Sequence, residues 1–260
     1  MSRALNVGLD SQVLGKVKHG MPECCLHVDA VEGYERWAPT YDDAPNPLLA
    51  REERYLLPLL GDMSKKSVLD LACGTGRWLE RVAARGSKSA VGIDRSSAML
   101  RVARRKDGIR QRLVEAASEN LPFSTASFDL AICSFALGHI EDLEAMVHEL
   151  ARVVRLGADV FVSDLHPEAY QRGWRVGFRD GAAAVQIEMR SRPVEKIVEA
   201  FCSSGFGCRT HVTLFLSEPE EPLFAKAGKS HLFAESCRLP AVLVCRFRRL
   251  DAPAEDRRTE

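Results

Sequence analysis

Short apolar runs alternate with helix-like segments through the middle of the chain. The runs SVLDLA, SAVGID, RLVEA, FDLAICS and ADVFVSD are expected to be strands. In the segments between them, apolar residues recur at spacings of three and four, as Leu143, Met146, Val147 and Leu150 do. Short buried strands that alternate with amphipathic helices predict an α/β fold, a doubly wound and mostly parallel sheet with helices on both faces.

The residues that begin and end helices set the expected bounds of the helical segments. In chain order, helices are expected over 46–60, with Pro47 in the first turn and Pro58 bending or ending it, over 77–85, closed by Gly86, over 96–106, capped by Ser96 or Ser97, and over 142–155, ended by Gly157.

The pattern also divides the chain into parts. Residues 1–30 show no clear periodicity and are expected to be partly disordered. A helical cap segment over 31–66 comes next, then an α/β domain over 67–250, then a charged tail over 251–260. The α/β domain is expected to carry substrate-side insertions at about 166–192 and 217–238. The first of them contains a hairpin signal, Asp180-Gly181, between two alternating stretches.

Composition narrows the class of protein. Apolar residues make up 46% of the 260 residues, and acidic and basic residues balance at 36 each. This balance gives no reason to expect nucleic acid or an anionic membrane as a partner. The N-terminus lacks a continuous apolar segment, and no run approaches the roughly 18 apolar residues of a membrane helix. The eight cysteines show no CxxC spacing, which favours a reduced cytoplasmic protein without a metal site. Monomer and homodimer both remain open.

Polar and glycine residues gather where the first two strands of the α/β domain end. Gly74 and Gly76 follow the first strand, and Asp94 ends the second. The glycines allow a sharp turn and a close approach of a ligand, or serve the turn alone. Asp94 is placed to accept hydrogen bonds from a ribose diol, or to precede a helix as an N-terminal acid. A dinucleotide fingerprint would need a third glycine where Leu79 stands, so nicotinamide cofactors are disfavoured.

Four blocks in order resemble the class I S-adenosylmethionine-dependent methyltransferases, in particular the type 11 family that includes ubiquinone and menaquinone C-methyltransferases. The blocks are VLDLACGTG (68–76), VGIDRSSAML (91–100), ENLPFSTASFDLAICSFALGHI (119–140) and ELARVVRLGADVFVSD (149–164). They cover about 100 residues and imply the Rossmann-like methyltransferase fold with a seven-stranded sheet, one of whose last strands is antiparallel. YERWAPTYD (34–42) is similar to the aromatic segment that many members fold over the cofactor.

The resemblance implies S-adenosylmethionine as the cofactor and gives a role to individual residues. In the family's pattern, Asp70 lies near the methionine part, Ala72, Gly74 and Gly76 form the turn beneath the cofactor, Asp94 holds the ribose, Arg95 and Met99 flank the adenine, and Ser134 and Phe135 border the methionine part and the substrate mouth. Tyr34 and Tyr41 form a lid, or else a helix packing face. The family's usual acid before ENLPF is replaced here by Ala116, Ala117 and Ser118, so Ser118 or Glu119 is expected to meet the adenine instead.

The implied reaction is an in-line methyl transfer to a small-molecule acceptor, by O- or C-methylation. His139 and His166 follow two strand ends and are candidate general bases, or else ordinary loop histidines. Two alternatives stay open. One is a carboxyl methyltransferase acting on an acyl group bound to a carrier protein, and the other is a non-catalytic cofactor-binding sensor or partner subunit.

Overall fold

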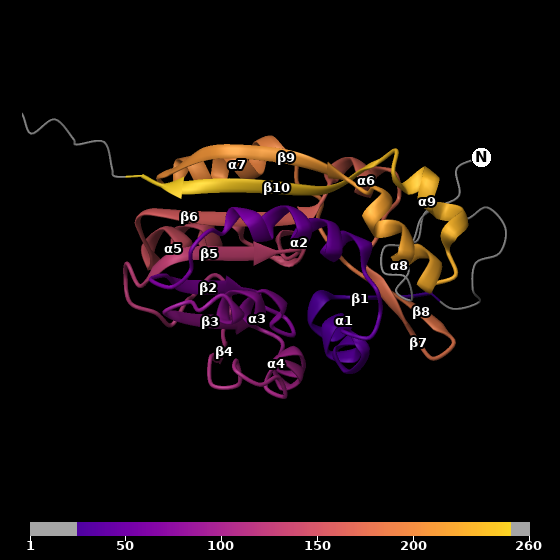
Figure 1. The fold of residues 1–260 in the computed structure, drawn as a ribbon, viewed down its shortest axis with the longest axis horizontal. Coiled ribbons are helices and arrows are strands. Elements are labelled where there is room, and N and C mark those ends of the chain that lie inside the picture. The colour runs from indigo at the N-terminus through magenta and orange to yellow at the C-terminus, as the bar shows by residue number, and fades with distance from the viewer. Residues whose placement is uncertain (1–24, 251–260) are drawn as a thin grey trace, which may run out of the picture.

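A computed structural model describes residues 25–250. Its main sheet has seven strands in the order β4-β3-β2-β5-β6-β10-β9 (Figure 1). Strand β10 is antiparallel to both of its neighbours, and the other adjacent pairs are parallel. This confirms the predicted fold class. The strands are β2 Ser67–Leu71, β3 Ser89–Asp94, β4 Leu113–Glu115, β5 Phe128–Ser134, β6 Val154–Leu165, β9 Phe206–Phe215 and β10 Pro240–Arg249.

Helices connect the strands and begin at the expected caps. The Asn46 side chain accepts hydrogen bonds from the first turn of α2, where Pro47 lacks an N–H, and the Ser96 hydroxyl caps α4. None of the helices within residues 25–250 is long and apolar enough to cross a membrane. They are α1 Ala30–Trp37, α2 Pro47–Leu59, α3 Arg77–Ala84, α4 Ser97–Ala103, α5 Leu143–Val153, α6 Pro167–Gln171, α7 Val194–Ser203, α8 Glu221–Lys226 and α9 Ser230–Ser236, with short 3-10 turns η1 Ala38–Thr40, η2 Leu137–His139 and η3 Glu218–Glu220.

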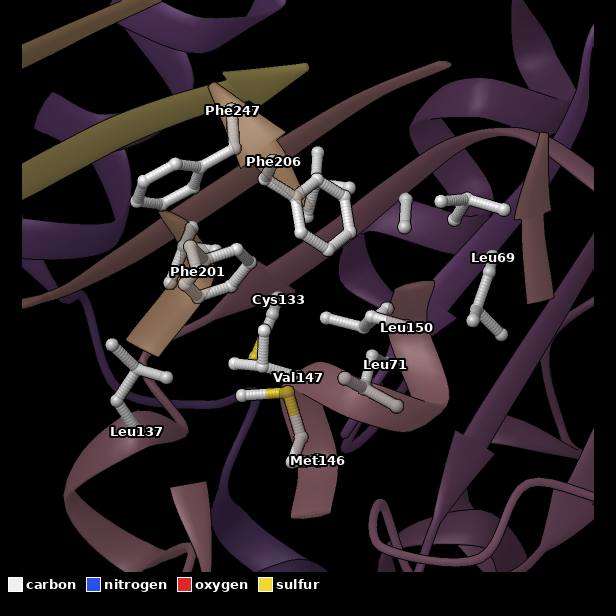
Figure 2. Packing of buried hydrophobic residues seen from close by; sticks show 14 of the residues in the cluster. Leu69, Leu71, Cys133, Leu137, Met146, Val147, Leu150, Phe201, Phe206 and Phe247 are labelled. Atoms are coloured by element: carbon white, nitrogen blue, oxygen red, sulfur yellow. The ribbon is translucent and has the colours of Figure 1, made fainter. Parts of the chain in front are cut away.

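Helices α5 and α7 cover one face of the main sheet. Figure 2 shows Val147 and Leu150 of α5 packed near Leu71 and Cys133 of the central strands. Farther along the same face, the ring of Phe201 in α7 stacks on Phe247 of β10, with centroids 3.9 Å apart. The central strands β2 and β5 are buried on both faces, because α2, α3 and α8 cover the opposite face.

A second, three-stranded sheet lies beyond the carboxyl ends of the parallel strands. Its hairpin joins β7 Gly177–Asp180 to β8 Ala183–Ile187 through Gly181, which has a φ of 58°, as the Asp-Gly signal predicts. Strand β1 Cys25–Val28 adds to β8 in parallel. The hairpin and α1 lie side by side (Figure 1), and a Cβ on Gly33 would stand 2.6 Å from Ile187 Cγ1.

Two of the expected boundaries differ in the structure. Helix α5 ends at Val153, and β6 begins at once at Val154, so Gly157 lies inside the strand with a φ of 77° instead of ending the helix. The β-branched pair Val153–Val154 favours this early change to extended backbone. Strand β1 falls in a stretch of sequence that shows no periodicity. It forms because it pairs with β8, which lies far along the chain. Residues 1–24 and 251–260, where most of the expected extension and tail fall, lie outside the described part, and the expected division into parts stays a prediction.

Replacing Phe247 by Ala should lower the free energy of unfolding by about 3–5 kcal/mol, because the buried stack with Phe201 leaves a cavity. Phe215→Ala is the control, since that ring is 45% exposed and its loss should cost about 0.5 kcal/mol or less. Urea unfolding followed by circular dichroism measures both values. Equal losses in the two variants would contradict the assignment of this layer to the core.

Candidate functional site

A hollow lies where β2, β3 and β5 end, and residues of α1 line one side of it. This first hollow has a volume of about 780 Å³, including space open to solvent, and lies at the point where the strand order reverses on either side of β2. Open α/β sheets bind ligands at such points. Its lining residues are Ala30, Val31, Tyr34, Tyr41, Ala72, Ile93, Asp94, Arg95, Ser96, Met99, Ala116, Ser118, Glu119, Ser134, Phe135, Ala136, His139 and Ile140.

Asp94 is held rigidly at the edge of the first hollow. One carboxylate oxygen accepts a hydrogen bond from the Gly74 backbone N–H and the other from that of Ser96, both at 2.8 Å. Burial raises the pKa of Asp94, and these two backbone donors oppose the shift. Each oxygen keeps a lone pair for a ligand, so two adjacent hydroxyl groups are a suitable partner.

The β2–α3 turn requires glycine at two positions, for different physical reasons. Both have a left-handed φ, 55° at Gly74 and 84° at Gly76. A Cβ on Gly76 would stand 2.6 Å from Ile109 Cδ1, so packing excludes it, whereas a Cβ on Gly74 would have no neighbour within 4 Å. Neither is a lining residue of the first hollow; Gly74 acts on it through its hydrogen bond to Asp94.

Asp70 serves α3 in the structure. Its side chain is buried, and one oxygen accepts a hydrogen bond of 2.9 Å from the backbone N–H of Leu79, in the first turn of that helix. Burial raises the pKa of Asp70 to about 7, against the lowering effect of Arg77. The structure therefore places this acid behind the turn that borders the first hollow, and it does not line the hollow itself.

Two residues other than glycine adopt left-handed backbone conformations at the first hollow. Ala72 follows β2 with a φ of 55°, and Phe135 follows β5 with a φ of 51°. This region costs an L-residue roughly 1–2 kcal/mol, and such strain gathers at functional sites. The two central strands thus end in strained residues that turn the chain around the same hollow.

Tyr34 of α1 reaches across the first hollow to His139. Its hydroxyl lies 3.1 Å from His139 Nε2, and His139 Nδ1 lies 3.1 Å from the backbone oxygen of Glu188. Burial lowers the pKa of His139 to about 4, so the ring is neutral at physiological pH. The Glu188 oxygen can only accept, so Nδ1 carries the proton and Nε2 accepts from the Tyr34 hydroxyl. These bonds join the cap segment to the sheet and to the hairpin side.

The cap segment is also tied to the turn below it. Thr75 donates a hydrogen bond of 2.6 Å to Asp42, and Lys106 pairs with Asp42 at 2.9 Å. Trp37 stacks on Phe178 of the hairpin with centroids 5.2 Å apart. These contacts fix Tyr34 and Tyr41 over the hollow.

A buried polar cluster around Glu52 of α2 holds one of the site residues in place. No sequence pattern indicates this cluster. Glu52 has no exposed surface and pairs with Arg77, and it also accepts a hydrogen bond from the indole N–H of Trp78. Its other oxygen accepts from Ser134, at 2.7 Å, and from Ser163. Ser134 lines the first hollow, so this cluster positions a site residue.

A second, narrower hollow shares a wall with the first. Tyr34, Tyr41 and Phe135 belong to both. The remaining lining residues of this second hollow are Trp37, Asn46, Leu48, Leu49, Asp164, Leu165, Arg175 and Val176. It is therefore mostly apolar and aromatic, with one carboxyl and one guanidinium group.

The structure brings most of the expected site residues together at the first hollow: Tyr34, Tyr41, Ala72, Asp94, Arg95, Met99, Ser118, Glu119, Ser134, Phe135 and His139. It does not bring His166 there. That ring accepts from the Glu168 backbone N–H at the start of α6, and its other nitrogen lies 3.3 Å from Thr213 Oγ1. Sequence reasoning missed Ile93, Ser96, Ala136 and Ile140, whose only signal was their place beside motif residues.

The residues that stand where the family's acid is expected also line the first hollow. Ala116 and Ser118 line it with Glu119, and the Ser118 hydroxyl donates a hydrogen bond of 2.9 Å to the Glu119 carboxylate. A carboxylate acceptor, Glu119, therefore stands two residues after Ala117, the position that corresponds to the family's acid.

Known proteins share this architecture. Residues 68–157 match a family model described as a methyltransferase domain. A ubiquinone biosynthesis O-methyltransferase of Nitrosomonas europaea is 33% identical over 147 residues, covering 52% of this chain and 60% of that protein. A malonyl-(acyl-carrier protein) O-methyltransferase of Legionella pneumophila is 31% identical over 143 residues, covering 54% and 48%. The chain thus spans about half of the length of these relatives. An S-adenosylmethionine-dependent methyltransferase structure from Mesorhizobium loti aligns with a TM-score of 0.59 at 22% identity, covering 78% of this chain and all of that one.

The sheet order with antiparallel β10 and the matching solved structure define the Rossmann-like methyltransferase fold. With the family match and the relatives, they place the chain in the class I S-adenosylmethionine-dependent methyltransferases. S-adenosylmethionine is the cofactor of this class. The first hollow fits it, because a fixed carboxylate, Asp94, is available for its ribose diol and the space is large enough for a nucleoside.

Asp94→Ala should weaken the binding of S-adenosylhomocysteine about ten- to a hundredfold, because a charged acceptor for two hydroxyl groups is lost. Isothermal titration calorimetry measures the affinity. Asp107→Ala, which removes a fully exposed acid, is the control and should bind as the wild type does. Unchanged affinity in folded Asp94→Ala would show that the ribose is held elsewhere.

Proposed function

We propose that the protein transfers a methyl group from S-adenosylmethionine to a small-molecule acceptor by in-line displacement. The observation that carries this proposal is the wall of Tyr34, Tyr41 and Phe135 shared by the two hollows. A cofactor in the first hollow and an acceptor in the second would meet beside these rings, where the two hollows adjoin. Holding two reactants in line supplies much of such a rate, since effective molarities reach about 10⁵ M or more.

We assign the binding roles as follows. Asp94 holds the ribose hydroxyl groups, Glu119 and Ser118 face the adenine amino group, and Arg95 and Met99 flank the ring. Ser134 and Phe135 border the methionine part, and Tyr34 and Tyr41 form the lid that excludes water. The bound cofactor supplies an electrophilic methyl group on a sulfonium centre. The place of these residues supports the roles, because each of them lines the first hollow.

His139 takes a positioning role in this proposal. Its two ring nitrogens are already engaged with Tyr34 and Glu188, and its low pKa leaves it a weak base. His166, also a candidate base in the sequence, is not assigned a role, because it lies outside both hollows.

A carboxyl methyltransferase acting on a carrier-bound acyl group is the second candidate, and the similarity to the Legionella enzyme favours it. Binding of the cofactor without turnover on any acceptor would instead indicate a sensor or partner subunit. We also propose a cytoplasmic protein, monomeric or homodimeric and without a nucleic-acid partner. The balanced charge and the cysteine pattern support these proposals, and light scattering with and without RNA would test the last two.

S-adenosylhomocysteine at about 1 mM should raise the melting temperature, and NAD should not, because a ligand that binds the native state stabilises it by mass action. Leu79 stands where a dinucleotide site needs glycine, and its side chain packs over Gly92 of β3. Differential scanning fluorimetry measures both shifts. Stabilisation by NAD alone would overturn the cofactor assignment.

His139→Gln should leave the pH dependence of turnover unchanged between about pH 5 and 8, because a ring with a pKa of about 4 does not titrate there. Turnover should fall modestly as Tyr34 loses its fixed partner. His148→Gln, on the exposed face of α5, is the control. Loss of an ascending limb near pH 6.5, with a drop of about 10²–10⁴ in turnover, would instead identify His139 as the base.

A further inference from the structure

The second hollow contains one carboxyl group that the roles assigned above do not use. Asp164 is the second-last residue of β6, and it is one of the lining residues of the second hollow although only 8% of it is exposed. One oxygen accepts a hydrogen bond of 2.8 Å from the Gly138 backbone N–H, and the other accepts from Leu165 at 2.6 Å. These two donors fix the carboxyl group, and a lone pair remains on each oxygen.

Two other buried carboxyl groups, Glu52 and Asp94, lie near the two hollows, and neither is available to a ligand in the second hollow. Glu52 accepts hydrogen bonds from Arg77, Trp78, Ser134 and Ser163 and has no exposed surface. Asp94 lines the first hollow and not the second. Asp164 is thus the carboxyl group placed to meet a molecule in the second hollow.

Arg175 gives the second hollow a positive group. Its guanidinium lies over the Tyr170 ring, and Nη1 donates to the backbone oxygens of Tyr170 and Trp174 at 2.6 and 2.7 Å. Within residues 25–250, the hydrogen bonds that this guanidinium donates leave from Nη1, so its remaining N–H groups can meet an anionic group of a ligand.

We propose that the second hollow binds an aromatic hydroxy acid, whose hydroxyl group donates to Asp164 and whose carboxylate meets Arg175, and that Asp164 is the general base of its O-methylation. This inference rests on the proposed function. The aromatic side chains of Tyr34, Trp37 and Phe135, which line the second hollow, suit a flat ring. A carboxylate as the methylated group would stand against the carboxylate of Asp164, which disfavours the carrier-bound acyl candidate.

The step balances in atoms and electrons. The acceptor O–H proton moves to a carboxylate oxygen of Asp164 as the acceptor oxygen forms a bond to the methyl carbon. The bond from that carbon to sulfur breaks, its electron pair stays on sulfur, and the sulfonium becomes a neutral thioether. The products are the methyl ether, S-adenosylhomocysteine and protonated Asp164, which returns its proton to water after release.

The surroundings of Asp164 suit a base near neutral pH. Burial raises its pKa to about 6, and the backbone donors and Arg192 oppose the shift. Glu52 raises it further, Tyr34 and Cys133 are the other titratable groups within its electrostatic reach, and Arg175 shares its hollow. A base is most effective when its pKa lies near the working pH.

Methyl transfer to 3,4-dihydroxybenzoate, with labelled S-adenosylmethionine, tests the proposal, together with calorimetric binding of that acid to the S-adenosylhomocysteine complex. The wild type should bind and methylate the acid, and kcat/KM should rise through an apparent midpoint near pH 6. Asp164→Asn should lose about 10²–10⁴ in turnover and the ascending limb, while its affinity for S-adenosylhomocysteine stays the same. Arg175→Gln should mainly raise KM. Glu168→Gln, an exposed change on α6, is the control and should behave as the wild type does.

Each failure has its own meaning. If S-adenosylhomocysteine does not bind the wild type, the proposed function fails. If it binds, but 3,4-dihydroxybenzoate neither binds nor is methylated, the inference fails while the function stands. If Asp164→Asn keeps the wild-type turnover and pH profile, Asp164 is not the base. If Asp164→Asn has a lowered melting temperature, Asp164→Glu is measured in its place. Asp164→Glu should keep the ascending limb, because it keeps a carboxylate.

Discussion

The buried ion pair between Glu52 and Arg77 is the constraint on which the site depends. Glu52 comes from the cap side of the chain, in α2, and Arg77 opens α3 directly after the glycine turn. Two charges removed from water are tolerated only when the remaining lone pairs are also satisfied, and Ser134, Ser163 and Trp78 supply those hydrogen bonds. Removing Arg77 would leave the fully buried Glu52 without its cation, at a cost of about 3–5 kcal/mol. The pair therefore ties α2, the β2–α3 turn and the end of β5 into one rigid unit.

The first hollow lies beside this unit and is surrounded by strand ends and by the cap segment. The strained ends of β2 and β5, at Ala72 and Phe135, turn the backbone around the first hollow. Segments far apart in sequence then close it, because β1 pairs with β8 and the Tyr34 hydroxyl donates to His139. Closing a site in this way excludes water and strengthens the electrostatic interactions inside it. In the proposed function, the cap, the hairpin and the sheet together hold the methyl donor and the acceptor in line.

Each of the two hollows has a buried carboxyl group, for which we propose a different role. Asp94 and Asp164 stand at the ends of β3 and β6, and backbone N–H donors fix both. The same burial raises the pKa of both groups. Asp94 lines the first hollow and Asp164 the second, so the roles that we propose for these two similar carboxyl groups differ because they line different spaces.

The sequence by itself determined the order of strands and helices, the hairpin at Gly181 and the turn with its acid Asp94, because each depends on residues close together in the chain. Eleven of the site residues expected from the sequence line one hollow, because motifs at strand ends meet at one edge of a parallel sheet. Only the tertiary structure decided the rest. Strand β1 has no periodicity of its own and exists through pairing with β8, and Asp70 faces α3 and not the ligand space. Glu52, the tautomer of His139 and the second hollow depend on partners 25 to 111 positions away, and no local pattern records such partners.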